Sequence, residues 1–195
     1  MKEIVIVKAG GTNFASIEDA MERLGCKVFY AHNEKDITNA EKVLIPGVGS
    51  MKVGAENIKN IKNIVRNLTQ PVLGICLGMQ MLFEKSQENL EAESFGIVNQ
   101  QIIHLPSDVI APHTGWNKLI FQNKQSIFAE ISSGHVYFTH SYYAPFGEYT
   151  QSYCEYGNYK ISAIIQKENF YGFQFHPERS GSYGLELLKQ FIQKA

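Results

Sequence analysis

The chain has 195 residues, of which 44% are hydrophobic and 19% charged, and its formal net charge at pH 7 is −1. This length suits one domain over residues 1–195 with a substantial core, and the near-neutral charge argues against nucleic-acid binding. No apolar stretch is long enough for a membrane span or a secretory signal, so we expect no membrane association. Three cysteines without metal-ligand spacing (Cys26, Cys76 and Cys154) predict a reduced, cytoplasmic protein that binds no metal.

The first half of the chain alternates strand and helix signals. Residues 4–7 are a short apolar run followed by "AGGT", which is typical of a strand buried on both faces. Further short strands are predicted at 27–30, 43–45 and 72–75. Helices are predicted between them from apolar residues at helical spacing, over Phe14 to Leu24, over Ile58 to Leu68, and over a segment holding Met79, Met81, Leu82 and Phe83. Strand and helix in alternation indicate a parallel sheet with helices on both faces.

The second half is richer in strand signals. The segments "GIVNQQIIHL", "HVYFTHSYY", "SAIIQ" and "FYGFQF" contain many β-branched or aromatic residues and are separated by glycine and polar breaks. A closing helix is predicted from about Gly184. We therefore expect an α/β fold with a single doubly wound, mostly parallel central sheet, flanking helices and an additional antiparallel portion.

The stretch "PVLGICLGMQML" raises the question of what Cys76 does. Its residues Gly74, Cys76 and Gly78 stand where a strand passes into a helix, and small flanking residues permit the sharp turn that lifts a nucleophile above a sheet. An ordinary thiol is only about 3% ionised at pH 7, so a nucleophile would need a base or a helix N-terminus beside it. Cysteine is also among the most often buried residues. From this stretch alone, a core thiol and a nucleophile remain equal alternatives.

Among six histidines, His176 has the strongest claim to be a base for Cys76. Pro177 keeps it out of helical geometry, and in an extended segment Glu178, two residues on, would project to the same side. A carboxylate there would fix the imidazole tautomer and stabilise the imidazolium. We expect surface or capping roles for the remaining histidines, with His140 left open; the others are His32, His104, His113 and His135.

The segment "IPGVGS" (45–50) is a third signal. It ends a predicted strand with two glycines, and such a loop can present backbone N–H groups to an oxyanion. Taken alone, this segment could be an ordinary turn, because Pro-Gly and Gly-x-Gly sequences are common in turns. Beside the Cys76 turn, at the carboxyl end of a parallel sheet, it lies where an oxyanion hole would be built.

Taken together, five segments resemble the motifs of the class I (triad) glutamine amidotransferases, in the right order and across nearly the whole chain. They are "PGVGS", "GICLGMQMLFEKSQE", "HTGWN", "YFTHSYY" and "NFYGFQFHPERSG". "GICLGMQ" with "FHPE" carries the resemblance to the family, and "GWN", "YFTHSYY" and "HPERSG" narrow it to the branch that serves histidine biosynthesis. The resemblance implies hydrolysis of glutamine to glutamate and ammonia, which passes to a separate (β/α)8-barrel cyclase subunit. No cofactor is expected.

Carried over position by position, the resemblance implies a role for each of several residues. Cys76 becomes the nucleophile, His176 the acid and base, and Glu178 its orienter. The oxyanion hole falls to the backbone N–H of Leu77 and of Val48 or Gly49. Glutamine would be held by Gly49, Gln80, Glu88, Ser141 and Tyr142, and the partner subunit by Asn13, Trp116, Tyr137 and Arg179. Gln80 and Glu88 could equally be solvated helix residues, and Trp116 a core residue.

The chain departs from the family pattern in its first loop, "KAGGTNFAS", which retains only Gly11 and Asn13 of the usual motif. Thr114 and Arg179 also stand where Met and Lys are more common. Three other functions compete with the main hypothesis: a related amidotransferase that feeds another acceptor, such as one in sugar modification; a partner-independent cysteine hydrolase; and a non-enzymatic binding module.

Overall fold

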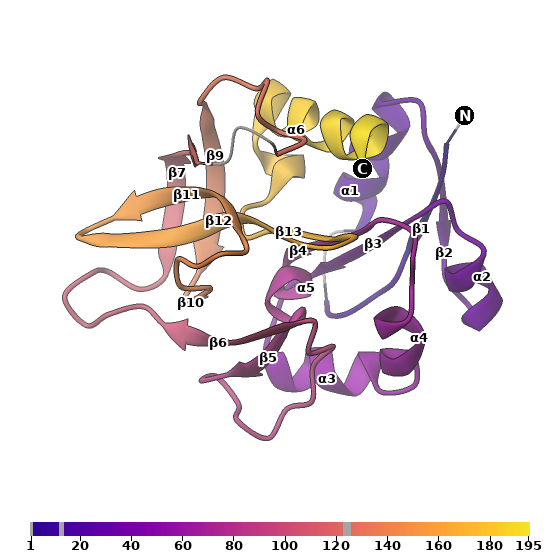
Figure 1. Cartoon of the computed structure of the whole chain (residues 1–195), viewed down its shortest axis with the longest axis horizontal. Helices are drawn as coiled ribbons and strands as arrows, with labels where there is room; N and C mark the ends of the chain where they lie inside the picture. The colour runs from indigo at the N-terminus through magenta and orange to yellow at the C-terminus, as the bar shows by residue number, and fades with distance from the viewer. Residues whose placement is uncertain (1, 12–13, 123–125) are drawn as a thin grey trace.

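The computed structural model describes residues 2–11, 14–122 and 126–195. An eight-stranded sheet runs through the molecule in the order β2-β1-β3-β4-β13-β12-β11-β8 (Figure 1). Its strands are β1 (Glu3–Ile6), β2 (Lys27–Tyr30), β3 (Lys42–Gly47), β4 (Val72–Cys76), β8 (Ile120–Phe121), β11 (Thr150–Tyr156), β12 (Tyr159–Lys167) and β13 (Phe170–Phe173). The first five strands in this order pair in parallel and the remaining pairs are antiparallel, which confirms the predicted fold class.

Helices cover both faces of the parallel half. Figure 1 shows α1 (Phe14–Arg23) and α6 (Gly181–Lys194) on one side, with α3 (Met51–Ile58) and α4 (Lys62–Arg66) on the other. Because side chains alternate along a strand, neighbouring strand residues enter different cores. Leu44 packs in the core beneath α1 and α6, and Val43 in the core beneath α3 and α4. The short α2 (Glu34–Thr38) begins with a capping box formed by Asn33 and Asp36.

Two small sheets stand beside the main one. One contains β5 (Phe83–Ser86), β6 (Val98–His104) and β10 (Tyr142–Tyr143), and the other contains β7 (His113–Lys118) and β9 (His135–His140). The strands β7 and β11 lay outside the sequence prediction. In β7 only His113 is fully buried. In β11 the buried residues Thr150, Gln151 and Ser152 are themselves polar, so neither strand shows an apolar residue at every second position.

Two predicted helices differ from the structure. The helix expected from Ile58 to Leu68 is divided into α3 and α4, because the Ile61 N–H donates to the Ile58 carbonyl and tightens the chain into a turn. The helix after β4 is a single turn, α5 (Leu77–Gln80), and Phe83 already belongs to β5. In both cases the apolar residues still reach the core, so their spacing indicated burial correctly but helix length wrongly.

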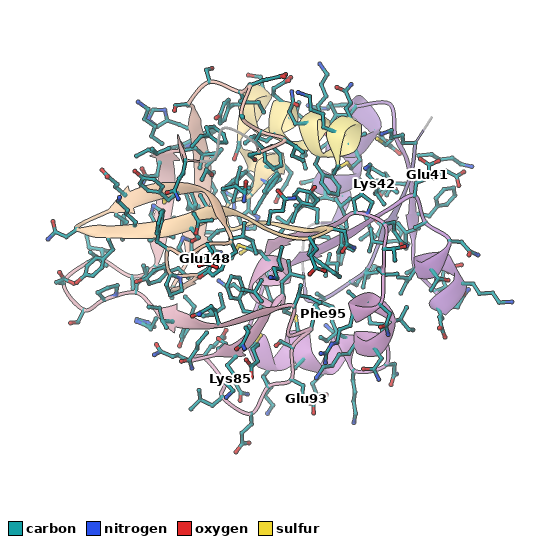
Figure 2. All side chains as sticks on the ribbon, in the orientation of Figure 1. Glu41, Lys42, Lys85, Glu93, Phe95 and Glu148 are labelled. Carbon is teal, nitrogen blue, oxygen red and sulfur yellow. The ribbon has the colours of Figure 1, made fainter. Side chains whose placement is uncertain are left out.

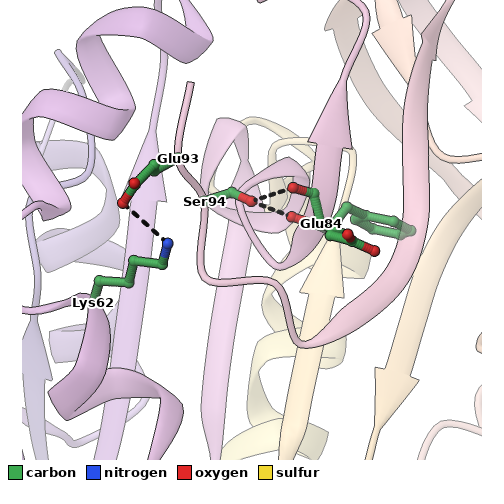
Figure 3. A network of polar contacts seen from close by, with 5 residues as sticks. Lys62, Glu84, Glu93 and Ser94 are labelled. Carbon is green, nitrogen blue, oxygen red and sulfur yellow. Dashed lines mark hydrogen bonds and ion pairs between the residues drawn. The ribbon is translucent and has the colours of Figure 1, made fainter. Parts of the chain in front are cut away.

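The segment between β5 and β6 is fastened to the body of the protein by polar contacts. The Ser94 hydroxyl donates to the backbone carbonyls of Phe83 and Glu84, and Lys62 Nζ lies 3.1 Å from Glu93 Oε2 (Figure 3). Phe95 is fully buried, whereas Glu93 lies at the surface (Figure 2). These anchors set the path of the segment that carries Glu88.

Candidate active site

Cys76 lies on a strained turn between β4 and α5. Its backbone has φ 53° and ψ −109°, a conformation that costs a non-glycine residue about 1–3 kcal/mol. The flanking glycines permit this turn. A Cβ at Gly78 would lie 1.6 Å from the Ile45 carbonyl oxygen, and one at Gly74 would lie 2.5 Å from the Gly78 carbonyl oxygen. The sequence prediction of a sharp turn at this cysteine is therefore confirmed.

His176 and Glu178 face Cys76 from the segment after β13. Glu178 Oε1 lies 2.8 Å from His176 Nδ1, and both side chains are buried. His176 is extended as predicted, but Glu178 belongs to a 3₁₀ turn, η1 (Pro177–Arg179). The two side chains therefore meet because the 3₁₀ turn folds the chain back. They do not meet because alternate residues of an extended segment project to the same side.

The imidazole of His176 is held in its charged form. Burial alone would lower its pKa, but contacts with the Cys76 thiol and the Glu178 carboxylate outweigh burial and raise the pKa to about 10. Within the described chain, His176 Nε2 is buried without a hydrogen-bond partner, so the cysteine lies near it but beyond hydrogen-bonding geometry. Such contacts are often loose in the absence of substrate.

A cavity of about 370 Å³ opens at Cys76. Its walls include every residue predicted to hold glutamine or the oxyanion: Val48, Gly49, Leu77, Gln80, Glu88, Ser141 and Tyr142. Pro112, Thr139 and His140 also line it, although no pattern in the sequence marks them as binding residues. A cavity of about 690 Å³ exists beside Phe146 and Tyr149, but it contains no cysteine or histidine. Side-chain chemistry therefore marks the smaller cavity as the candidate site.

Gln80 and Glu88 are not solvated helix residues. Gln80 is buried, and its amide donates to the Tyr142 carbonyl at 2.8 Å and to Gln174 Oε1 at 3.1 Å. Glu88 lies in the segment after β5, where its carboxylate accepts from the Met51 N–H at 3.0 Å at the start of α3. Each side chain has a defined place in the cavity wall, which excludes the solvated alternative for both.

The Val48 N–H, one of the two oxyanion donors expected in "PGVGS", already has a hydrogen-bond partner in the structure. The Val48 N–H donates to the Gly11 carbonyl at 2.7 Å in an isolated β-bridge. The Val48 N–H can therefore donate to an oxyanion only if this bridge opens. At Leu77, the N–H belongs to the first turn of α5, where backbone N–H groups have no partner within the helix.

The residues predicted to meet a partner lie next to the candidate site. Trp116 is 57% exposed and packs edge-on against Tyr137, and the Arg179 guanidinium lies 4.2 Å from the Tyr137 ring centroid. The exposure of Trp116 excludes the core alternative. Tyr137 also bridges to His176 through the His176 N–H and the Tyr137 carbonyl, so this surface touches the His–Glu pair directly. Asn13, the fourth predicted contact, lies outside the described residues.

Within the described residues, no cluster of three or more His, Cys, Asp or Glu side chains is arranged to hold a metal ion. None of the described helices has the length and apolar character needed to cross a bilayer. The remaining cysteines are buried, and desolvation raises the pKa of Cys154 to about 12 and also raises that of Cys26. Their thiols are therefore protonated at neutral pH.

A cysteine on a strained strand-to-helix turn, a buried imidazolium–carboxylate pair and a mostly parallel sheet are the features of α/β enzymes that use a cysteine nucleophile. A model of the family "Glutamine amidotransferase class-I" matches residues 5–195, and the chain belongs to this family. Solved structures agree on the fold: a glutamine amidotransferase superposes with a TM-score of 0.77 at 16% identity, covering 97% of both chains. PurLQS from Thermotoga maritima gives 0.69 at 20% identity, covering 98% of this chain and 95% of that one.

Closer relatives carry one particular name, imidazole glycerol phosphate synthase subunit HisH. The protein from Colwellia psychrerythraea is 42% identical, with 97% of this chain and 92% of the relative covered. Those from Staphylococcus epidermidis and from Buchnera aphidicola subsp. Schizaphis graminum are 40% and 38% identical. The matches cover 97% and 98% of this chain, and 96% and 99% of the relatives.

Proposed function

We propose that this chain is the glutaminase subunit of an imidazole glycerol phosphate synthase and acts as one domain over residues 1–195. It hydrolyses glutamine to glutamate and supplies the ammonia to a partner subunit. The observation that carries this proposal is the 370 Å³ cavity, in which the strained Cys76 meets the polar wall formed by Gln80, Glu88 and Tyr142. Full-length similarity to proteins named as the HisH subunit supports the choice of synthase.

The reaction proceeds in two steps. The Cys76 thiolate attacks the side-chain amide carbon of glutamine, and the oxyanion receives hydrogen bonds from the Leu77 N–H and a second N–H of the 48–49 segment. His176, charged at neutral pH, protonates the leaving nitrogen, so ammonia departs and a γ-glutamyl thioester remains. The neutral His176 then takes a proton from water, and hydroxide attack on the thioester releases glutamate and restores the thiolate. Glu178 keeps the imidazole in place throughout.

Glu88 and Gln80 select a free amino acid. A carboxylate in the wall suits the α-ammonium of glutamine, and Glu88 has one oxygen bound to the Met51 N–H, which fixes its orientation. Gln80 is held by two hydrogen bonds and follows Cys76 by one helical turn. The cavity thus offers a rigid polar wall opposite the nucleophile.

The partner is a (β/α)8-barrel cyclase that docks on Trp116, Tyr137 and Arg179. An exposed tryptophan beside an arginine stacked on tyrosine has the composition of an interface hot spot. The cyclase uses the ammonia on a phosphoribulosyl nucleotide to make imidazole glycerol phosphate and an aminoimidazole carboxamide ribotide. Docking beside the loop of Gly11 opens its bridge to Val48 and completes the oxyanion hole, so activity depends on the partner. The complex works in the cytoplasm, a location that suits three free thiols.

The test is ammonia release from glutamine by the chain alone, with the cyclase, and with the cyclase and its phosphoribulosyl nucleotide. We expect strong release only in the third case, and its loss in Cys76→Ser. Cys26→Ser is the matched control, because it changes a buried thiol away from the cavity. Stimulated release that survives Cys76→Ser would overturn the proposed chemistry.

A second experiment separates the competing functions. Complementation of a histidine auxotroph lacking this subunit supports the histidine pathway. If complementation fails although the chain has glutaminase activity that a partner stimulates, the chain is an amidotransferase for another acceptor, such as one in sugar modification. Full activity on γ-glutamyl peptides without any partner would indicate a hydrolase.

A further inference from the structure

His113 and His140 form a buried pair that the proposed chemistry does not use. They stand directly opposite each other on the antiparallel strands β7 and β9 and are 3% and 6% exposed. His113 Nδ1 lies 3.1 Å from His140 Nε2. The surface or capping role predicted for His113 is wrong: the ring is stacked between Phe138 and Tyr156, with centroids 4.7 and 4.1 Å away.

When both rings are neutral, the contacts of the pair admit only one arrangement of protons. His140 Nδ1 lies 3.0 Å from the Tyr142 carbonyl, which can only accept, so Nδ1 of His140 carries the hydrogen. In a neutral ring the other nitrogen, Nε2, is then an acceptor, so His113 must donate to it from Nδ1. His113 Nε2 is left as an acceptor, and the Asn117 amide faces it at 3.4 Å.

Both rings are neutral at physiological pH. Burial lowers the pKa of His113 to about 4. Burial, together with the nearby His113 and His176, lowers the pKa of His140 to about 3, although its bond to the Tyr142 carbonyl opposes this. Because both nitrogens of His140 are engaged, it has no free position from which to exchange a proton with a substrate.

The chain of contacts ends in the wall of the cavity. The Tyr142 carbonyl accepts one hydrogen bond from His140 and another, at 2.8 Å, from the Gln80 amide. Gln80 in turn donates to Gln174. One carbonyl therefore ties the Ser141–Tyr142 segment, on one side of the cavity, to the helical turn that follows Cys76 on the other.

We propose that His113 and His140 are positioning residues for glutamine binding: they hold the Tyr142 carbonyl, and through it Gln80, at the separation from Cys76 that the substrate requires. This inference rests on the proposed function. The stacked rings of Phe138 and Tyr156 hold His113 in place, and His113 orients His140 through their hydrogen bond. His140 in turn holds the Tyr142 carbonyl in the cavity wall. The pair shapes the binding site and takes no part in bond making.

The test compares steady-state constants for glutamine in the complex of this chain with the cyclase and its phosphoribulosyl nucleotide. His140→Leu removes the donor to Tyr142, and we expect KM to rise roughly two- to tenfold, the worth of one hydrogen bond, with kcat changed less than about twofold. His140→Asn offers an amide donor near the position of Nδ1 and should recover most of the loss. His113→Phe keeps the stack but removes the donor to His140, and should raise KM by a smaller factor.

A merely structural role predicts another pattern, in which the variants lower the folded fraction and hence apparent kcat, with KM unchanged. That pattern, or an unchanged KM in all three variants, overturns the inference. If the wild-type complex releases no ammonia that depends on Cys76, the proposed function fails first. If the wild type is active and the variants match it, the positioning role alone fails.

A spectroscopic measurement does not depend on activity. Imidazole ¹⁵N chemical shifts of the wild-type protein at pH 7 should assign both His113 and His140 as neutral rings with the hydrogen on Nδ1. A ring of either residue found with its hydrogen on Nε2, or doubly protonated, would contradict the chain of contacts.

Discussion

The contact between His176 and Glu178 makes the stability of this protein depend on pH in a specific way. Their side chains meet at 2.8 Å and are 5% and 8% exposed, and the pKa of His176 is raised from 6.5 to about 10. The ring is thus charged at neutral pH and pairs with a carboxylate. Glu178→Gln keeps the shape of that side chain but removes its charge, so the imidazolium loses its nearest counter-charge.

The size of the effect follows from the pKa change. A folded-state pKa above the unfolded value stabilises the protein fully below pH 6.5, and this stabilisation is lost as the pH rises through about 10. The complete change corresponds to about 5 kcal/mol as an upper bound, of which Cys76 supplies a part. We expect Glu178→Gln to lower the free energy of unfolding by about 2–3 kcal/mol at pH 7 and by only about 1 kcal/mol near pH 9.5.

Urea unfolding of both proteins at the two pH values measures this difference. Glu186→Gln is the matched control, because that side chain is 43% exposed and lies 3.8 Å from Lys189 Nζ. It should change stability by less than about 0.5 kcal/mol with no trend in pH. An equal loss for Glu178→Gln at both pH values would refute the reasoning, since it would mean that His176 is neutral in the folded protein at pH 7.

Two further pairs of substitutions test how the Cys76 turn and the segment between β5 and β6 are built. Gly78→Ala places a Cβ 1.6 Å from the Ile45 carbonyl oxygen, so thermal unfolding should show a loss of more than about 2 kcal/mol, and stimulated ammonia release should disappear. Gly96→Ala is its control: it meets open space at φ +63° and should cost about 1 kcal/mol, and a similar loss in both would contradict the steric argument. Ser94→Ala removes the hydroxyl whose single hydrogen is shared between the Phe83 and Glu84 carbonyls beneath the segment that precedes β6, and should destabilise by about 1–2 kcal/mol. Lys62→Met removes an exposed ion pair worth less than about 1 kcal/mol, and the reverse order of these two losses would show that the ion pair is the true anchor.

The candidate catalytic residues were visible in the sequence because the motif around each of them is local. The spacing of Gly74, Cys76 and Gly78 predicts a sharp turn, which only glycines on both sides of the cysteine permit. His176 and Glu178 are separated by a single residue. The parallel half of the sheet was equally visible, since strands buried on both faces are short, continuous apolar runs. These signals need nothing beyond a few neighbouring residues.

Tertiary structure alone decided what depends on residues far apart in the chain. No local pattern marks His113 as buried, because its burial comes from Phe138 and Tyr156, which belong to two other strands. No local pattern predicts the hydrogen bond from the Val48 N–H to the Gly11 carbonyl either, because it depends on where the fold places the loop of Gly11. Local sequence patterns identify the residues that carry reactive groups, whereas long-range packing decides which hydrogen bonds those groups make. A hydrogen bond forms only where the fold brings donor and acceptor together.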